Sequence, residues 1–259
     1  MEPGDRTDLV ETLTRRRAIL EAIDDEPVHK PVLARELDVA RSTVDRAVRQ
    51  LEAKGLAERG QEGVALTTAG ALALDVYGEF ATRLDAVWDA RDVLADLPGP
   101  DLADPAFFDG ADVVRATVSA PDRPVRAFVD LVAEATHARG FSPTAYGAYV
   151  DAFERGVVED GLTAELAFSD EALTELTTTH RDAIVRAANT GRVTVHRVDD
   201  LPSAGLVVME RADAPTVAAM GVHDGAGLDA VVTNDDPSAV AWARDLVDDR
   251  YAAGDRIPL

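Results

Sequence analysis

The residues best suited to chemistry lie in one short stretch, RSTVDRAVRQLEAKGL, which runs from residue 41 to residue 56. Arginine side chains can bind the two acceptor atoms of guanine, and a glutamine amide suits adenine. Backbone N–H groups at the start of a helix can hold a phosphate. The stretch therefore offers the groups that bind both the bases and the backbone of double-stranded DNA. The candidate DNA-binding residues in it and just after it are Arg41, Ser42, Thr43, Arg46, Arg49, Gln50, Lys54 and Arg59.

A helical wheel places Ser42, Arg46 and Arg49 opposite an apolar face. At about 100° per residue, Val44, Val48 and Leu51 fall on one side. Arg46 and Arg49 fall on the other side. The residues predicted to contact or approach bases are Arg46, Arg49 and Gln50, and those predicted to contact phosphates are Ser42, Thr43, Arg41 and Lys54. The alternative is a small helical domain whose basic face is only solvated.

The chain as a whole is strongly acidic, so this basic face is an exception. Its 259 residues carry a formal net charge of −22. Residues 1–70 hold 11 basic and 14 acidic residues, and the remaining residues hold 15 and 34. The basic residues are 24 arginines and only two lysines. This composition is typical of extreme halophiles, in which a Debye length of about 3 Å at 1 M salt screens self-repulsion. An acidic mesophilic protein from a GC-rich genome is the alternative.

The composition also excludes several classes of protein. There are no cysteines, so disulfides, thiolate zinc sites and cysteine nucleophiles are excluded. No apolar run approaches the roughly 20 residues of a membrane span. The first residues, MEPGDRTD, lack the pattern of a signal peptide. We therefore expect a cytoplasmic protein that does not enter a membrane.

Three helices and a hairpin are predicted to position the basic face. The first helix should end near Ala22, before Pro27, and the second should cover residues 31–37. Ser42 is predicted to cap the third helix. After Gly55 the chain alternates as a hairpin with a turn at residues 60–63. This is the order of a helix-turn-helix domain with a wing.

Residues 13–70 resemble the winged helix-turn-helix domains of prokaryotic transcription regulators. The resemblance is carried by LARELDVARSTVDRAVRQLEAKGLAERGQEGVALTTAG, including the late LTTAG that leads into the next helix. It implies a DNA-binding domain over residues 1–70, with double-stranded DNA as the partner.

A long helix is predicted after this domain, within a linker of residues 71–97. Its apolar stripe consists of Leu72, Val76, Phe80 and Leu84. Because helix-turn-helix proteins usually bind as two-fold dimers, we expect this stripe to form the interface of a homodimer. The alternative is that the stripe packs against the second domain of its own chain.

The second domain, residues 98–259, is predicted to be an α/β domain with a single sheet, which makes the whole chain α+β with an α/β half. The predicted strands are residues 113–119, 162–168, 193–198, 206–210, 217–222 and 228–233. The predicted helices are residues 124–139, 144–160, 170–189 in one or two pieces, and a last helix opened by Asp236 and Pro237.

Residues 111–253 resemble the effector domain of archaeal methanogenesis-regulator-type transcription factors. The matching stretches are ADVVRATVSAPDRP, YVDAFERGVVEDGLTAEL, NTGRVTVHRVDDLP and GLDAVVTNDDPSAVAWARDLVDDRYAAG. The resemblance implies a domain that senses a small molecule and a fold like half of a phospholipase-D-like unit. It also implies an archaeal regulator of the haloarchaeal type.

Enzyme chemistry has little support in the sequence. A phospholipase-D-like site needs His followed two residues later by Lys, but His223-Asp224-Gly225 lacks the lysine and the second domain contains none. The five histidines have no metal-ligand spacing, and no phosphate-binding glycine motif occurs. We therefore expect no catalytic residues, metal or cofactor. An enzyme or a protein-interaction module with an accessory winged domain remains the alternative.

A ligand pocket in the second domain is a further possibility. Tyr146 and Tyr149, together with Arg126, Arg181 and His196, could line one. Ordinary amphipathic packing of these residues is the alternative.

Overall fold

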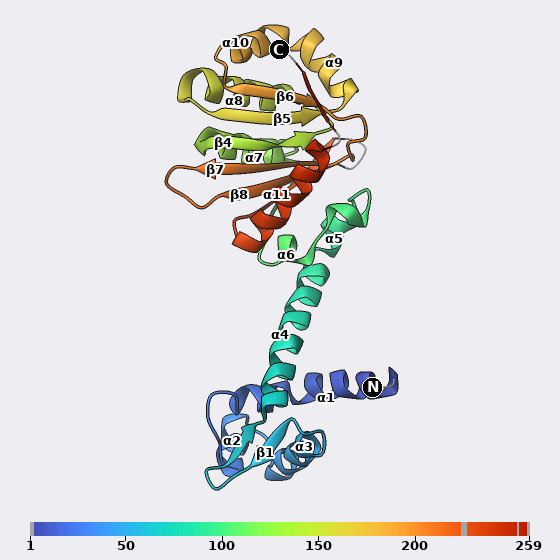
Figure 1. The fold of residues 1–259 in the computed structure, drawn as a ribbon, viewed down its shortest axis with the longest axis vertical. Coiled ribbons are helices and arrows are strands. Elements are labelled where there is room, and N and C mark those ends of the chain that lie inside the picture. Colours follow the sequence, from blue (N-terminus) through green and yellow to red (C-terminus); the bar gives the residue numbers. More distant parts are fainter. Residues whose placement is uncertain (1–2, 224–226, 253, 258–259) are drawn as a thin grey trace. The chain divides into compact units, whose positions relative to one another are not determined.

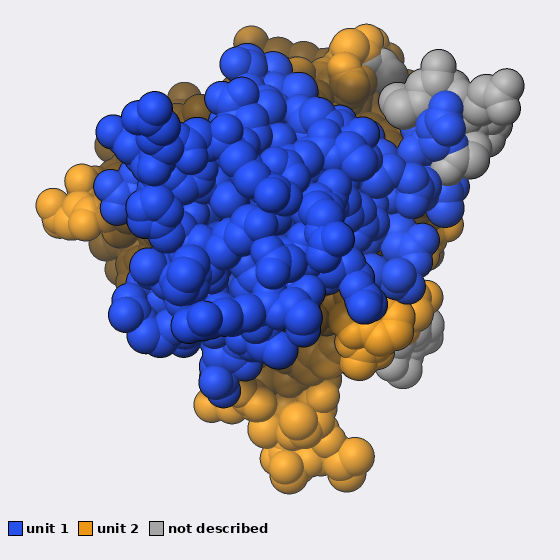
Figure 2. Space-filling model, turned by 90° about the horizontal axis from the view of Figure 1, so that it is seen from below, with its two compact units in different colours: residues 1–83 blue, residues 84–259 orange. Residues whose placement is uncertain are grey.

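The computed structural model describes the chain except for residues 1–2, 224–226, 253 and 258–259. It forms two compact units, residues 1–83 and 84–259, which are coloured separately in Figure 2. The boundary falls inside one helix, so each unit is described by itself. Among the described residues, no helix combines the length and the apolar character that crossing a bilayer requires.

The first unit contains three helices, a hairpin and the start of a fourth helix (Figure 1). The elements are α1 (Pro3–Ala22), α2 (Lys30–Glu36), α3 (Arg41–Ala53), β1 (Ala57–Arg59), β2 (Val64–Leu66) and α4 (Thr68–Asp89). Strands β1 and β2 pair antiparallel, with Glu58 opposite Ala65. The predicted order of three helices and a hairpin is present. The long helix predicted after the hairpin begins three residues earlier than expected, at Thr68, and ends earlier, at Asp89.

The predicted cap of α3 is wrong. Ala40, not Ser42, is the N-cap residue, and no side chain caps the helix. The carbonyl of Ala40 already accepts hydrogen bonds from the N–H groups of Thr43 at 2.8 Å and Val44 at 3.3 Å. Because the chain is helical from Arg41 onward, Ser42 lies inside the first turn.

The core of the first unit gathers the apolar faces of its helices and its hairpin. Leu20, Leu33, Val44 and Leu51 are fully buried in it. The start of α4 approaches this core closely at Gly70, where a Cβ atom would lie only 1.9 Å from the carbonyl oxygen of Leu56. Only glycine allows this approach, which fixes where α4 leaves the hairpin.

The second unit is built around one large sheet. Its helices are α5 (Arg91–Leu94), the 3-10 turn η1 (Pro100–Leu102), α6 (Pro105–Phe108), α7 (Arg123–Glu134), α8 (Gly147–Arg155), the π-helical turn η2 (Gly156–Asp160), α9 (Asp170–Thr179), α10 (Arg181–Ala188) and α11 (Pro237–Tyr251). Its strands are β3 (Asp112–Arg115), β4 (Ala135–Ser142), β5 (Thr163–Phe168), β6 (Val193–Arg197), β7 (Gly205–Arg211), β8 (Val217–His223), β9 (Leu228–Asn234) and β10 (Asp255–Ile257).

The eight strands of this sheet lie in the order β10-β6-β5-β4-β7-β8-β9-β3. Strands β4, β5 and β6 are parallel, and every other neighbouring pair is antiparallel. Helices cover both faces (Figure 1). One core lies under α6 and α11 and includes Phe107 and Val247, while the other lies under α7, α8 and α10 and includes Phe128 and Ala187. This arrangement confirms the prediction of an α/β fold around a single sheet.

The central strand β4 was not predicted. The predicted helix over residues 124–139 ends at Glu134, and Ala135–Ser142 is a strand. Alanine, histidine and arginine do not favour a strand, so the local sequence reads as more helix. Two neighbours override this preference, because β4 pairs with β5 on one side and β7 on the other. Gly140 permits the close packing there, since a Cβ atom would lie 2.2 Å from the carbonyl oxygen of Leu206.

Two smaller corrections concern the edges of the sheet. The strand predicted over residues 113–119 ends at Arg115, because Thr117 and Ala120 close a tight turn. The edge strand β10 was not predicted either, and it pairs with β6 after the end of α11.

The side chain of Asn234, in β9, forms hydrogen bonds with the end of α6 and the start of α11. Replacing Asn234 by alanine is therefore expected to destabilise the fold. Its Nδ2 donates to the carbonyls of Phe107 at 3.0 Å and Asp109 at 2.8 Å, and its Oδ1 accepts from the N–H of Asp236 at 2.8 Å. The side chain is buried, so these groups would lose their partners, at a cost of about 1–3 kcal/mol. Urea unfolding in molar KCl measures this loss. Asn189→Ala, at an exposed helix end, is the control, and equal stability of the two variants would contradict the prediction.

Candidate nucleic-acid interface

The two faces of α3 differ as the helical wheel predicted. Val44, Ala47, Val48 and Leu51 are fully buried in the core of the first unit. The residues of α3 that are exposed and were predicted to contact DNA are Arg41, Ser42, Thr43, Arg46 and Arg49. The helix is therefore anchored by one apolar face and presents arginines and hydroxyls on the other.

Arg46 and Arg49 are three residues apart and are both exposed, so they lie on one side of α3. The Nε of Arg49 donates to the carbonyl oxygen of Asp45 at 3.1 Å. Neither arginine forms an ion pair with a carboxylate in the described part of the chain. Their guanidinium groups therefore remain available for acceptor atoms of another molecule.

An ion pair that the sequence did not indicate joins α2 to α3. Lys30 Nζ lies 2.7 Å from Asp45 Oδ1. The hydrogen bond and the charge of Lys30 hold the pKa of Asp45 below its usual value, and Arg49 contributes in the same direction. Lys30 thus compensates the one carboxylate that lies next in sequence to Arg46.

Gln50 does not share the outer face with the two arginines. Its Oε1 accepts from Arg16 Nε at 3.1 Å, and its Nε2 donates to Thr12 Oγ1 at 3.2 Å. Both partners belong to α1. The amide that was predicted to approach bases is therefore engaged inside the first unit.

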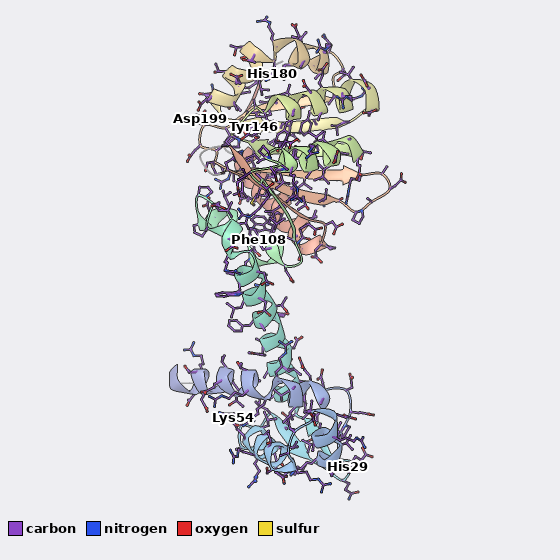
Figure 3. All side chains as sticks on the ribbon, turned by 180° about the vertical axis from the view of Figure 1, so that it is seen from behind. His29, Lys54, Phe108, Tyr146, His180 and Asp199 are labelled. Carbon is purple, nitrogen blue, oxygen red and sulfur yellow. The ribbon has the colours of Figure 1, made fainter. Side chains whose placement is uncertain are left out.

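Lys54 and Arg59 also have partners within the first unit. Lys54, labelled in Figure 3, forms an ion pair with Asp8, and its side chain is only 23% exposed. Arg59 in β1 pairs with Glu52 at 2.6 Å. A DNA phosphate would have to compete with these carboxylates for the two cations.

The second unit offers few groups for catalysis. Among the described residues, no cluster of three or more histidine and carboxylate side chains could hold a metal ion. The Nδ1 of His223 lies 2.8 Å from the carbonyl oxygen of Ser203. Asp224 and Gly225, which follow it in the sequence, lie outside the described residues.

Two protein families match parts of the chain. The model of the family described as "Methanogenesis regulatory protein FilR1, middle domain" matches residues 121–253. A second model, "HVO_A0261 N-terminal domain", matches residues 4–92, which include α3 and all of α4. No curated protein sequence matches the chain.

Two solved structures show a limited likeness. The archaeal chromatin protein TrmBL2 has 14% sequence identity and a TM-score of 0.44, over 89% of this chain and 88% of its own. Nuc, a phospholipase D family member from Salmonella typhimurium, has 10% identity and a TM-score of 0.45, over 57% of this chain and 99% of its own. The match to the FilR1 middle domain covers more than half of the residues, and the chain therefore belongs to the family of the methanogenesis regulatory protein FilR1.

Proposed function

We propose that this protein is an archaeal transcription regulator that binds a specific DNA sequence through α3. The observation that carries the proposal is the exposed pair Arg46 and Arg49 on a helix whose opposite face is fully buried. An arginine in the major groove can bind guanine O6 and N7 together. Membership of a family of regulatory proteins supports the proposal independently.

The first unit supplies the geometry that such binding needs. Helices α2 and α3 are joined by residues 37–40, where Asp38 adopts a φ of 50°. Aspartate tolerates this left-handed conformation better than most residues, so the chain can turn sharply between the helices. We assign α2 and α3 to a winged helix-turn-helix with α3 as the recognition helix and the β1–β2 hairpin as the wing.

The DNA contacts are assigned according to whether each side chain already has a hydrogen-bond or ion-pair partner within the first unit. Arg46 and Arg49 contact bases, and the phosphate contacts come from the exposed first turn with Arg41, Ser42 and Thr43. Contacts by the three remaining candidates are secondary, because each must first give up an internal partner. These residues are Gln50, Lys54 and Arg59.

The regulator acts as a homodimer that pairs through α4. The side chains of Leu72, Val76, Phe80 and Leu84 are 62%, 64%, 52% and 55% exposed. They are spaced four residues apart and form one ridge along the helix. Two such ridges interdigitate when helices cross at about −50°, so we propose a crossed pair of helices rather than a parallel coiled coil.

The acidic surface suits the cytoplasm of an extreme halophile. At molar salt the charge of −22 is screened within a few ångströms, at a Debye length of about 3 Å. DNA binding should therefore be tested in molar KCl. A titration against the protein's own promoter and against random DNA of equal length tests the proposal. Equal affinity for both would contradict sequence-specific recognition.

The second unit is proposed to sense a signal rather than to catalyse a reaction. We expect no hydrolysis of bis-p-nitrophenyl phosphate or p-nitrophenyl acetate, because residues 84–259 contain no lysine to assist a phosphodiester mechanism. Absorbance at saturating substrate measures this, with His223→Ala as the comparison. Turnover by the unmodified protein that disappears in His223→Ala would contradict the prediction and favour an enzyme.

A further inference from the structure

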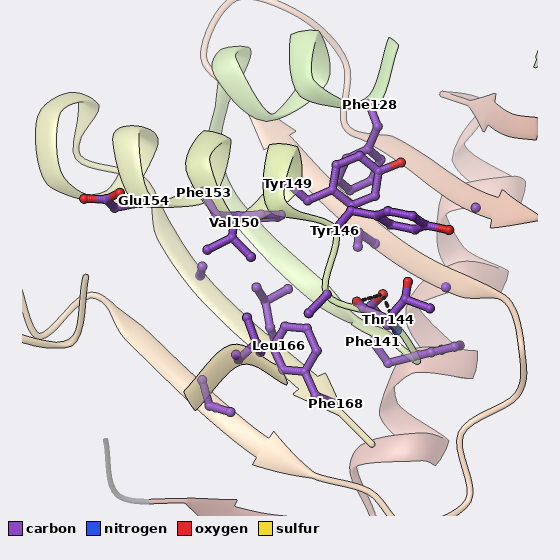
Figure 4. Close-up of a pocket in the computed structure, with 18 of the residues that line it drawn as sticks. Phe128, Phe141, Thr144, Tyr146, Tyr149, Val150, Phe153, Glu154, Leu166 and Phe168 are labelled. Carbon is purple, nitrogen blue, oxygen red and sulfur yellow. Dashed lines mark hydrogen bonds between the residues drawn. The ribbon is translucent and has the colours of Figure 1, made fainter. Parts of the chain in front are cut away.

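The second unit contains a cavity of about 90 Å³ that no function yet described uses. It lies between the sheet and the helices α7, α8, α9 and α10 (Figure 4). Ser142 and Phe168, the last residues of the parallel strands β4 and β5, both line it. In open α/β sheets, ligands bind at the carboxyl ends of strands, near a point where the direction of the connections changes. Here β4 and β5 are parallel, so Ser142 and Phe168 place the carboxyl ends of both strands at one end of the cavity.

The space exists because small residues stand where larger ones would fill it. Ala164 and Ala219 lie on the sheet side, and Ala183 and Ala187 lie on α10. All four are buried, so their small size leaves room inside the fold rather than at its surface.

One wall of the cavity is aromatic (Figure 4). The rings of Phe128 and Tyr149 have centroids 4.3 Å apart, and those of Tyr146 and Tyr149 are 5.4 Å apart and nearly perpendicular. The sequence therefore indicated part of this site correctly, since both tyrosines line it. The other three residues that the sequence suggested for a pocket do not line this cavity. Arg126 pairs with Asp122, His196 contacts Glu165, and Arg181 is not among the lining residues.

Two polar atoms of the lining lack a partner in the described part of the chain. They are the hydroxyl oxygens of Thr144 and Tyr149, and both are buried. Burial raises the pKa of Tyr149, so its hydroxyl stays protonated and can donate a hydrogen bond. A buried polar group without a partner is costly, and a ligand that supplies one recovers that cost.

Apart from the tyrosines, the ionisable side chains of the lining in the described part of the chain are Glu154 and His223, and the Nδ1 of His223 lies 2.8 Å from the carbonyl oxygen of Ser203. Among the described residues, Glu154 is the one carboxylate that lines the cavity, and Arg186 pairs with Glu154 from outside the lining. The remaining lining is mostly aliphatic and aromatic. An ionised ligand would lose its hydration without gaining a counter-charge, which is strongly unfavourable.

We propose that this cavity binds a small, uncharged aromatic molecule that carries one or two hydrogen-bonding groups, as a phenol does. The ring packs against Phe128 and Tyr149, and the polar group meets the hydroxyls of Tyr149 and Thr144. This molecule would be the signal of the regulator, so the inference deepens the proposed sensing role and, in that respect, depends on it.

The first part of the test compares three probes of similar size on the full chain. The probes are 4-methylphenol, toluene and 4-methylbenzoate. Binding of each probe is measured by calorimetric titration and by the shift of the thermal midpoint, both in molar KCl at neutral pH. We expect 4-methylphenol to bind about tenfold more tightly than toluene, because of one added hydrogen bond. The carboxylate should not bind measurably. Absence of binding by 4-methylphenol, or equal binding of the carboxylate, would overturn the proposal.

The second part uses variants of the cavity itself. Thr144→Val with Tyr149→Phe keeps the shape and should reduce the affinity for 4-methylphenol to that for toluene. Tyr77→Phe with Thr178→Val removes the same two hydroxyl types outside the cavity and should change neither affinity. Ala187→Leu fills the cavity and should abolish binding of both probes, and Ala164→Val on the opposite side repeats this test if the leucine disturbs folding. Unchanged binding by the double variant or by a folded filling variant would overturn the assignment.

Operator binding is measured on the same preparations, so that the two proposals fail separately. If the protein binds the operator but none of the probes, the proposal for the cavity is wrong and the proposed DNA-binding function stands. If the protein binds the probe but has no operator affinity, the cavity remains a binding site, but its ligand is not the signal of a DNA-binding regulator.

Discussion

Replacing Arg46 and Arg49 together by alanine is expected to abolish most of the sequence-specific DNA binding. Each arginine that holds a guanine by two hydrogen bonds contributes about 1–3 kcal/mol, so the double variant should lose about 30-fold to 10⁴-fold in operator affinity. Affinity for random DNA should fall much less, because base contacts contribute little there. Binding titrations of both DNAs in molar KCl measure the difference.

The fold should survive this change, because both side chains are exposed and neither packs in the core of the first unit. The thermal midpoint is therefore expected to match that of the unmodified protein. Arg123→Ala with Arg126→Ala provides a matched control. These two arginines are also exposed, three residues apart and on one helix, α7, of the second unit. The control removes the same charge and should retain operator affinity.

The salt dependence of binding should be shallow. The slope of affinity against salt increases with the number of phosphates that the protein neutralises. Lys30, Lys54 and Arg59 are already paired with carboxylates of the first unit, so each must give up an internal partner before it can neutralise a phosphate and release a counterion from DNA. An unchanged operator affinity in the variant with Arg46 and Arg49 replaced would show that this face of α3 does not read DNA.

The sequence predicted α3 and its two faces because their signal is local. The period that buries Val44, Val48 and Leu51 also exposes Arg46 and Arg49, and all five lie within eight consecutive residues. The same holds for most strands and helices of the second unit, whose apolar patterns lie within single elements.

The partners of Gln50 and Lys54 could not be predicted in this way. Gln50 contacts a residue 38 positions away and Lys54 one 46 positions away, so only the packing of α1 against α3 brings them together. Strand β4 was missed for a related reason. Its composition does not favour a strand, and its pairing with β5 and β7 decides the structure. The cavity depends on buried alanines of separate elements, which leave no pattern in the sequence.

Replacing Phe80 and Leu84 by glutamate is expected to convert a dimer into monomers. Both side chains are more than half exposed on α4, so the two charges should cost the isolated chain little. Across a pair of helices the same charges would be buried opposite each other, and burying unpaired charge is strongly unfavourable. Sedimentation in molar KCl should give twice the chain mass for the unmodified protein and a single chain mass for the variant.

The DNA affinity of the monomeric variant should fall as well, since a dimer holds two half-sites at once and loses about 10²-fold to 10⁴-fold in avidity when it separates. Val118→Glu with Val185→Glu is the matched control, because these exposed valines lie in the second unit and not on α4. The control should stay dimeric. A lower thermal midpoint without a change in mass would instead indicate that the stripe packs within its own chain. If the unmodified protein already sediments as a single chain, the homodimer is no part of the proposed function. The DNA titration then decides the role of Arg46 and Arg49 independently.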